Sequence, residues 1–180
     1  MTRRELDVEL LRELQDREEI TQKLHDFARG IDDLDFAAVA RCFAPDVRWD
    51  YGPGAGAPIQ GRDKLEAFVR ESFSDKSVDA GSLSVVRIKR TSHHVSNIRV
   101  DFDGPNAARS EAYVFTWHEM IDNDRPGLVW GRWQDRWTHS ADEGWRIADR
   151  KMLVSATDNY FAIGYSVWDR DVAFASPSLR

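Results

Sequence analysis

The sequence predicts a single α+β domain in which helices come first and an antiparallel sheet follows. Residues up to Phe73 carry apolar side chains at helical spacing. After Gly81, strand-like segments alternate with short polar turns. A chain of 180 residues without internal repeats fits one domain, because it can bury most of the surface that its unfolded form exposes. We therefore treat residues 1–180 as one domain of the α+β class.

Three helices are predicted in the first part of the chain. The segment from Asp7 to Ile31 is amphipathic, and its apolar face carries Leu24, Phe27, Ala28 and Ile31. Asp35 is a suitable N-cap for a short second helix that runs to Arg41, and the turn at Pro45-Asp46 ends that helix. A third helix is expected from Arg62 to Phe73, with one face formed by Leu65, Phe68, Val69 and Phe73.

The predicted strands form a meander after one early strand. The early strand runs from Val47 to Tyr51, and a loop follows at Pro53 to Ala57. The later strands are joined by polar turns and are predicted at Leu83–Ser96, Ile98–Phe102, Ala108–Ile121, Leu128–His139 and Trp145–Val154. The tail from Ser155 to Arg180 is aromatic and aperiodic. Its pattern leaves open whether it is a lid, a cavity plug or an oligomer contact.

Composition and charge exclude several classes of protein. A net charge of −6 argues against nucleic-acid binding, which depends largely on Lys and Arg. No apolar run approaches the ~20 residues that span a bilayer, and the segment Met1 to Glu9 lacks the features of a signal peptide, so we expect a cytoplasmic protein without a membrane partner. The single cysteine, Cys42, lies in an apolar run and is interpreted as a buried thiol. The seven Trp and nine Phe residues either line a cavity or fill the core.

The sequence lacks the motifs that usually hold a cofactor or a metal. It has no Gly-rich phosphate loop, no Gly-x-Ser-x-Gly elbow, no cysteine cluster and no histidine pair spaced for zinc. His93 and His94 are adjacent on a predicted strand, which directs their rings to opposite faces and makes them a poor metal pair. We therefore expect no cofactor and no metal.

Three positions place ionisable groups inside apolar segments: Asp32, one of His93 and His94, and His118. A carboxylate that binds one imidazole nitrogen fixes the tautomer and leaves the other nitrogen free to remove a proton from a substrate. Asp and His thus suffice for a general base. Taken singly, each residue also has a structural interpretation, with Asp32 as a helix-end residue and His118 as a half-buried strand residue.

Several segments resemble the SnoaL-like and scytalone dehydratase-like branch of the nuclear transport factor 2-like superfamily. The resemblance covers about Leu10 to Leu153, so the domain core is placed at about 10–154 and the tail at 155–180. It is carried by the segments His25–Phe36, Phe43–Tyr51 and Thr91–Asn97. By this resemblance Asp32 and His93 form a catalytic dyad, and Tyr51 is a phenol that faces the substrate.

Further site residues are implied by the same resemblance. His118 follows His93 by 25 residues, a spacing similar to that of scytalone dehydratase, and Gln134 stands where that enzyme has an amide. Ile31 and Arg132 replace a tyrosine and a small hydroxyl residue of that enzyme, so the substrate is expected to differ from scytalone. We expect the substrate-binding residues to be Trp49, Trp117, Arg132 and Gln134.

The resemblance implies a cone-shaped curved antiparallel sheet wrapped by the N-terminal helices, with a cofactor-free site inside. The leading hypothesis is a lyase of the dehydratase type that acts on an aromatic or polycyclic small molecule. His93 would abstract the proton, while Tyr51, His118, Gln134 or Arg132 would donate hydrogen bonds. An isomerase or polyketide cyclase with the same dyad, and a non-catalytic dioxygenase β-subunit-like or ligand-binding protein, are the alternatives. An aromatic sheet face would favour a homodimer or homotrimer.

Overall fold

The computed structural model describes residues 3–52, 56–73, 88–121 and 123–159. Within these residues the helices and strands follow one another as α1 (Arg3–Asp32), α2 (Phe36–Ala40), β1 (Phe43–Asp50), β2 (Ile59–Gln60), α3 (Arg62–Ser72), β3 (Ile88–Phe102), β4 (Ala107–Met120), β5 (Gly127–Ser140) and β6 (Gly144–Asp158). Helices thus precede most of the sheet, and the predicted α+β class is confirmed.

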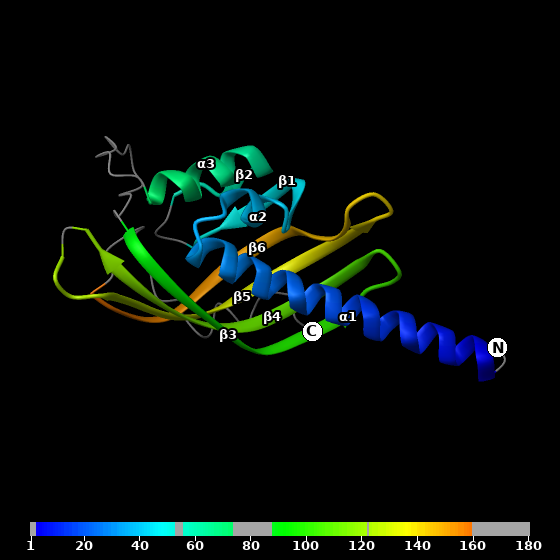
Figure 1. Ribbon diagram of the computed structural model, residues 1–180. Coiled ribbons are helices and arrows are strands. Elements are labelled where there is room, and N and C mark those ends of the chain that lie inside the picture. Colours follow the sequence, from blue (N-terminus) through cyan, green and yellow to red (C-terminus); the bar gives the residue numbers. More distant parts are fainter. Residues whose placement is uncertain (1–2, 53–55, 74–87, 122, 160–180) are drawn as a thin grey trace.

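The strands form one curved sheet in the order β2-β1-β6-β5-β4-β3. Figure 1 shows the four long strands side by side, with α1 along one face of the sheet and α2 and α3 on that same side. Every neighbouring pair is antiparallel except β1 and β6, which run parallel. The sheet is therefore mixed, where the sequence predicted an antiparallel one, because β1 joins the meander at the edge of its last strand.

The helices bury the predicted faces. Leu24, Phe27, Ala28 and Ile31 of α1 are all buried, as are Leu65 and Val69 of α3. Asp35 caps α2, since its side chain accepts a hydrogen bond of 2.9 Å from the Ala38 backbone N–H. The expected turn at Pro45-Asp46 is wrong, because both residues belong to β1. The register of β1 against β6 is irregular between Phe43 and Arg48, which is where a strand tolerates a proline.

The long strands also differ from the prediction at their ends. β3 is one strand from Ile88 to Phe102, where two were expected, and its register shifts between Ser96 and Arg99. Asn97 in this interval has a φ of 51°, a left-handed conformation that Asn adopts more readily than most residues. β6 continues to Asp158 and includes the beginning of the predicted tail. Residues 160–180 of that tail and most of the predicted loop at 53–57 lie outside the described residues.

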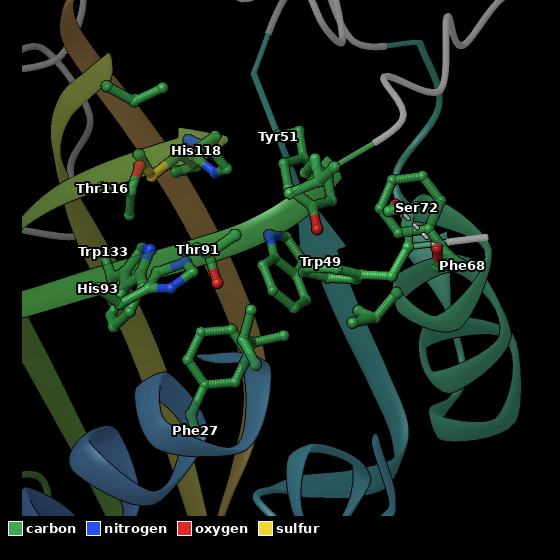
Figure 2. Close-up of a pocket in the computed structure, with 16 residues that line it drawn as sticks. Phe27, Trp49, Tyr51, Phe68, Ser72, Thr91, His93, Thr116, His118 and Trp133 are labelled. Carbon is green, nitrogen blue, oxygen red and sulfur yellow. Dashed lines mark hydrogen bonds between the residues drawn. The ribbon is translucent and has the colours of Figure 1, made fainter. Parts of the chain in front are cut away.

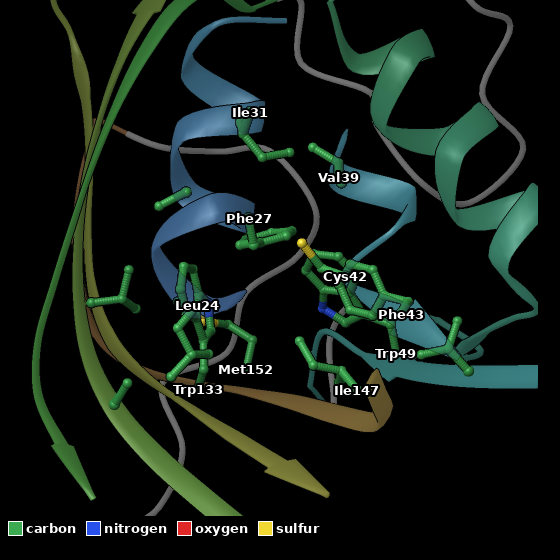
Figure 3. Packing of buried hydrophobic residues seen from close by; sticks show 14 of the residues in the cluster. Leu24, Phe27, Ile31, Val39, Cys42, Phe43, Trp49, Trp133, Ile147 and Met152 are labelled. Atoms are coloured by element: carbon green, nitrogen blue, oxygen red, sulfur yellow. The ribbon is translucent and has the colours of Figure 1, made fainter. Parts of the chain in front are cut away.

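The core lies between α1 and the concave face of the sheet. Figure 3 shows Leu24 and Phe27 of α1 among side chains of β1, β5 and β6. Cys42 belongs to this core as predicted, and burial raises the pKa of its thiol to about 11. Trp145 ties β6 to α1, because its indole N–H donates to Asp16 and its backbone N–H donates to Glu19, both at 3.0 Å. No helix in the described part of the chain is long and apolar enough to cross a membrane.

Candidate active site

The structure brings Asp32 and His93 together. Asp32 is the last residue of α1, and His93 lies in the middle of β3. The His93 ring atom Nδ1 is 2.7 Å from Asp32 Oδ1, and the His93 backbone N–H donates to Oδ2 at 2.9 Å. The Thr91 hydroxyl also donates to Oδ1, at 2.6 Å. The carboxylate is thus held by three donors that all come from one short stretch of β3.

Strand geometry decides which histidine meets Asp32. Successive side chains of a strand point to opposite faces, so Thr91 and His93 share the concave face while His94 lies on the convex one. The His94 ring is 5.6 Å from the Phe115 ring there, and its side chain is exposed. The prediction that the two rings point to opposite faces is confirmed.

The electrostatics of the pair fix the position of its proton. Burial has the largest influence on the Asp32 carboxyl and by itself raises its pKa. Hydrogen bonds from the His93 ring, the Thr91 hydroxyl and the His93 backbone, together with the charge of His93, outweigh it and lower the pKa of Asp32 below its ordinary value. Because this carboxylate carries no proton, His93 Nδ1 must donate the one between them. The Nε2 atom of a neutral His93 is then a hydrogen-bond acceptor.

A cavity of about 90 Å³ lies beside the pair, and its walls are mostly apolar, with several aromatic rings among them. Figure 2 shows Phe27, Trp49, Tyr51, Phe68 and Trp133 around it. The other apolar side chains that line it are Ile31, Val69, Phe73, Ile88, Val129 and Met152. On the same measure of volume, one water molecule needs only ~10–15 Å³. The space therefore suits an organic ligand better than an isolated water.

Polar groups concentrate on the wall formed by β3 and β4. Thr91 and His93 come from β3, and Thr116 and His118 come from β4. In the sheet register His93 is paired with Thr116, and Thr91 is paired with His118, which explains why the four side chains share one face. Asp32 does not itself line the cavity, so it reaches the site only through His93 and Thr91.

His118 is held in its neutral form. Burial, followed by the neighbouring His93, lowers the pKa of His118 to about 3, against opposing effects of a backbone hydrogen bond with Gly127 and of Asp32. Its ring centroid lies 6.0 Å from that of His93. At neutral pH the His118 imidazole therefore brings no positive charge to the cavity.

Two of the predicted aromatic residues do lie at the cavity. Trp49 and Tyr51 both line it, and their rings stack at 4.7 Å with an interplanar angle of 13°. The Tyr51 ring also packs against Phe68, with centroids 5.5 Å apart. Trp49 is 4% exposed, and its indole Nε1 has no hydrogen-bond partner among the described residues.

Three other predicted residues lie on the wrong face for this role. Arg132 and Gln134 flank the cavity residue Trp133 along β5, and they bind Glu111 on the convex face at 3.2 Å and 2.9 Å. Trp117 similarly alternates with the cavity residues Thr116 and His118 along β4. Trp117, Arg132 and Gln134 are therefore not among the described residues that line this cavity, because strand alternation directs them outward.

Several residues that line the cavity were not predicted as site residues from the sequence. They include Phe27, Thr91, Thr116 and Trp133. Thr116 and Trp133 are each adjacent in the sequence to a residue that was predicted to bind the substrate. The alternation along β5 is the signal that could have identified Trp133, since Asp135 two positions later also faces the core. No three His, Cys, Asp or Glu side chains within the described ranges converge as a metal site would require.

Behind the aromatic floor of the cavity lies a buried ion pair. The Arg150 guanidinium donates two hydrogen bonds of 2.8 Å to Asp135, and both side chains are fully buried. The guanidinium carbon is 4.4 Å from the ring centroids of both Phe27 and Trp133. This pair therefore supports two of the rings that the cavity presents to a ligand.

Comparisons with known proteins identify the family of this domain. Residues 12–151 match the family model of the SnoaL-like domain. Uncharacterized proteins of Mycobacterium tuberculosis and Mycobacterium bovis are 30% identical over 139 residues, which is 77% of this chain and 84% of each relative.

Solved structures show the same fold at lower identity. A proposed scytalone dehydratase from Novosphingobium aromaticivorans superimposes with a TM-score of 0.72 at 21% identity, covering 88% of this chain and 97% of that one. The hexachlorocyclohexane dehydrochlorinase LinA-type3 of Novosphingobium barchaimii gives a TM-score of 0.67 at 14% identity, with coverages of 87% and 97%. At such identities the likeness concerns the fold alone.

Proposed function

This chain belongs to the SnoaL-like domain family, within the nuclear transport factor 2-like superfamily, and we propose that it is a cofactor-independent lyase of the dehydratase type. The single observation that carries the proposal is the Asp32–His93 pair at the polar wall of an aromatic cavity. The family match extends over nearly the same residues as the resemblance found in the sequence, which is thereby confirmed.

In the proposed reaction His93 is the general base. Its Nε2 atom takes a proton from a C–H bond of the substrate, the released electron pair forms a C=C bond, and the C–O bond on the adjacent carbon breaks. The departing hydroxide takes up one proton and leaves as water, so the proton removed by His93 balances the reaction and the enzyme is unchanged. Asp32 orients the imidazole and stabilises its protonated form, which is how a carboxylate assists a histidine base.

A hydrogen-bond donor for the departing oxygen or for a developing enolate is available in the same cavity. The candidate is the Tyr51 phenol, which is among the lining residues. Donors fixed in a water-poor site stabilise developing negative charge more than they would in bulk solvent. This arrangement supports elimination, in which charge builds on oxygen.

The lining favours an uncharged, flat substrate. No Lys or Arg side chain is among the described residues that line the cavity, so a carboxylate or phosphate would be buried there without a counterion. Stacked rings such as Trp49 and Tyr51 suit an aromatic or polycyclic body. Two structural relatives are named as a dehydratase and a dehydrochlorinase, and both names describe eliminations.

The test is turnover without added metal or cofactor. Wild type, His93→Ala and Asp32→Asn are incubated with a panel of hydroxylated aromatic and polycyclic compounds, and the products are followed by mass. We expect wild type to release water from at least one compound and both folded variants to lose at least ~100-fold in rate. A product of unchanged mass would instead indicate an isomerase or cyclase. Turnover that persists in both variants would contradict the proposal.

A second candidate function is a non-catalytic ligand-binding or β-subunit role, which the reuse of this fold in unrelated functions keeps open. It predicts that Asp32→Asn and His93→Ala leave the activity of a copurifying enzyme unchanged. The buried pair weighs against it, because a charged carboxylate held by three donors beside a cavity is costly to maintain without a use.

We also propose that the chain forms a homo-oligomer through the convex face of the sheet. Tyr113 and Trp130 are 48% and 39% exposed there, although both are large aromatic residues. Glu111 pairs with Arg132 beside them, so an identical face can approach without unpaired charge. Sedimentation should show a dimer or trimer that Trp130→Glu converts to a monomer. Leu34→Glu is the control, since Leu34 is also exposed, and an unchanged mass of Trp130→Glu would contradict the interface.

A further inference from the structure

Asp32 occupies an unfavourable place for a negative charge. It ends the 30-residue helix α1, and the C-terminal end of a helix carries partial negative charge that repels a carboxylate. It is also partly buried, with 26% of its side chain exposed. A carboxylate in such a position stays ionised only if donors surround it.

β3 supplies these donors in a compact arrangement. His93 contributes its ring and its backbone N–H, and Thr91 contributes its hydroxyl. The Thr91 hydroxyl and the His93 ring share one acceptor atom, Oδ1, at 2.6 Å and 2.7 Å. Figure 2 shows Thr91 and His93 next to each other on the same strand, as expected for residues two apart.

We propose that Thr91 is a positioning residue of the dyad, whose hydroxyl holds Asp32 in the rotamer and charge state that orient His93. The inference rests on the proposed function of His93 as a base. Two features favour it. Of the three donors, the Thr91 hydroxyl is the one that can be removed without altering His93. Threonine is also stiff at its first side-chain torsion, so its hydroxyl is held in place at a small loss of entropy.

The same hydrogen bond determines what Thr91 presents to a ligand. A hydroxyl has one proton, and that of Thr91 is donated to Asp32. Its oxygen can therefore only accept a hydrogen bond from a molecule in the cavity, which Thr91 lines. Thr91 and the Nε2 atom of His93 thus form two neighbouring acceptors on the β3 wall.

The experiment compares Thr91→Val, which keeps the shape but removes the hydroxyl, with Thr91→Ser, which keeps the hydroxyl. The first readout is the pKa of the Asp32 carboxyl, followed by ¹³C NMR in the ligand-free protein. We expect this pKa to rise by about one unit in Thr91→Val and to stay near the wild-type value in Thr91→Ser. Ser92→Ala is the matched control, because it removes a neighbouring hydroxyl that contacts His94 instead.

The second readout is turnover of whichever panel compound the wild type converts. In Thr91→Val we expect kcat to fall about tenfold with KM within about threefold, and Thr91→Ser should restore most of kcat. An unchanged Asp32 pKa in a folded Thr91→Val protein would overturn the inference. If Thr91→Val does not fold, Thr91→Ala replaces it with the same expectations.

The experiments distinguish a wrong assignment of the general base from a wrong assignment of Thr91. If His93→Ala and Asp32→Asn retain turnover, the general base is wrong whatever Thr91 does. The NMR titration needs no substrate, so it decides whether Thr91 sets the charge state of Asp32 even in that case.

Discussion

The two faces of strands β3, β4 and β5 carry similar side chains in very different surroundings. The concave face presents His93, His118 and Trp133 beneath α1, while the convex face presents His94, Phe115 and Trp130. On the concave face His118 is buried and held neutral, while His93, with 9% of its side chain exposed, is paired with a carboxylate. On the convex face the His94 side chain is exposed. Enclosure by α1, more than residue type, distinguishes a candidate reaction site from a surface.

Two arginines, one on each face, are expected to differ most in their contribution to stability. We expect Arg150→Met to lower the free energy of unfolding by about 3–5 kcal/mol, because it leaves the buried Asp135 charged without a partner. Arg132→Met, which breaks the half-exposed pair with Glu111 on the convex face, should change it by at most about 1 kcal/mol. Urea denaturation followed by circular dichroism measures both.

The double variant Arg150→Met with Asp135→Leu is the control for this pair. It removes both charges, so most of the lost stability should return. If Arg150→Met and Arg132→Met lowered the free energy of unfolding equally, an unpaired charge would cost no more on the concave face than on the convex face.

His118 on the concave face should make the stability of the protein depend on pH. His118 has an ordinary pKa of 6.5 and a folded-state pKa of about 3. Between these values the unfolded chain binds a proton that the folded chain does not, so stability falls as pH decreases below 6.5. Well between the two pKa values, the slope attributable to this residue is about 1.4 kcal/mol per pH unit.

Replacing His118 by Gln should therefore flatten the loss of stability between pH 6.5 and pH 3, relative to wild type. Folding of His118→Gln at neutral pH is checked by circular dichroism, so that the comparison concerns the pH dependence alone. Thermal or urea unfolding over this pH range measures the difference. A wild-type slope that persists in His118→Gln would mean that His118 is protonated in the folded protein.

The difference between the faces also explains what could be predicted from the sequence. The stripe of α1 and the pairing of Asp32 with a histidine follow from local patterns and from the family resemblance. Trp117 and His118 are adjacent, so alternation alone excludes that both face one cavity. Applying that rule to β4 would have removed Trp117 from the predicted site.

Other features depend on contacts that are distant along the chain. The parallel pairing of β1 with β6 joins segments about 100 residues apart, and no local pattern specifies it. Register shifts next to Trp130 and after Arg136 change which residues of β5 and β6 oppose each other. The pair of Arg150 and Asp135 arises from that register, which is why neither residue stood out in the sequence.

The smallest expected effect concerns ligand recognition on the concave face. 2-Naphthol and 2-methoxynaphthalene have the same flat body, but only the first can donate a hydrogen bond to an acceptor such as the Nε2 atom of His93. One added hydrogen bond corresponds to about 1 kcal/mol, so calorimetry should give about fivefold tighter binding of 2-naphthol. His93→Ala should remove this preference, whereas His94→Ala should preserve it because His94 lies on the convex face. Equal affinities for the two compounds in wild type would mean that the polar wall does not select donors, and the faces would then differ in enclosure alone.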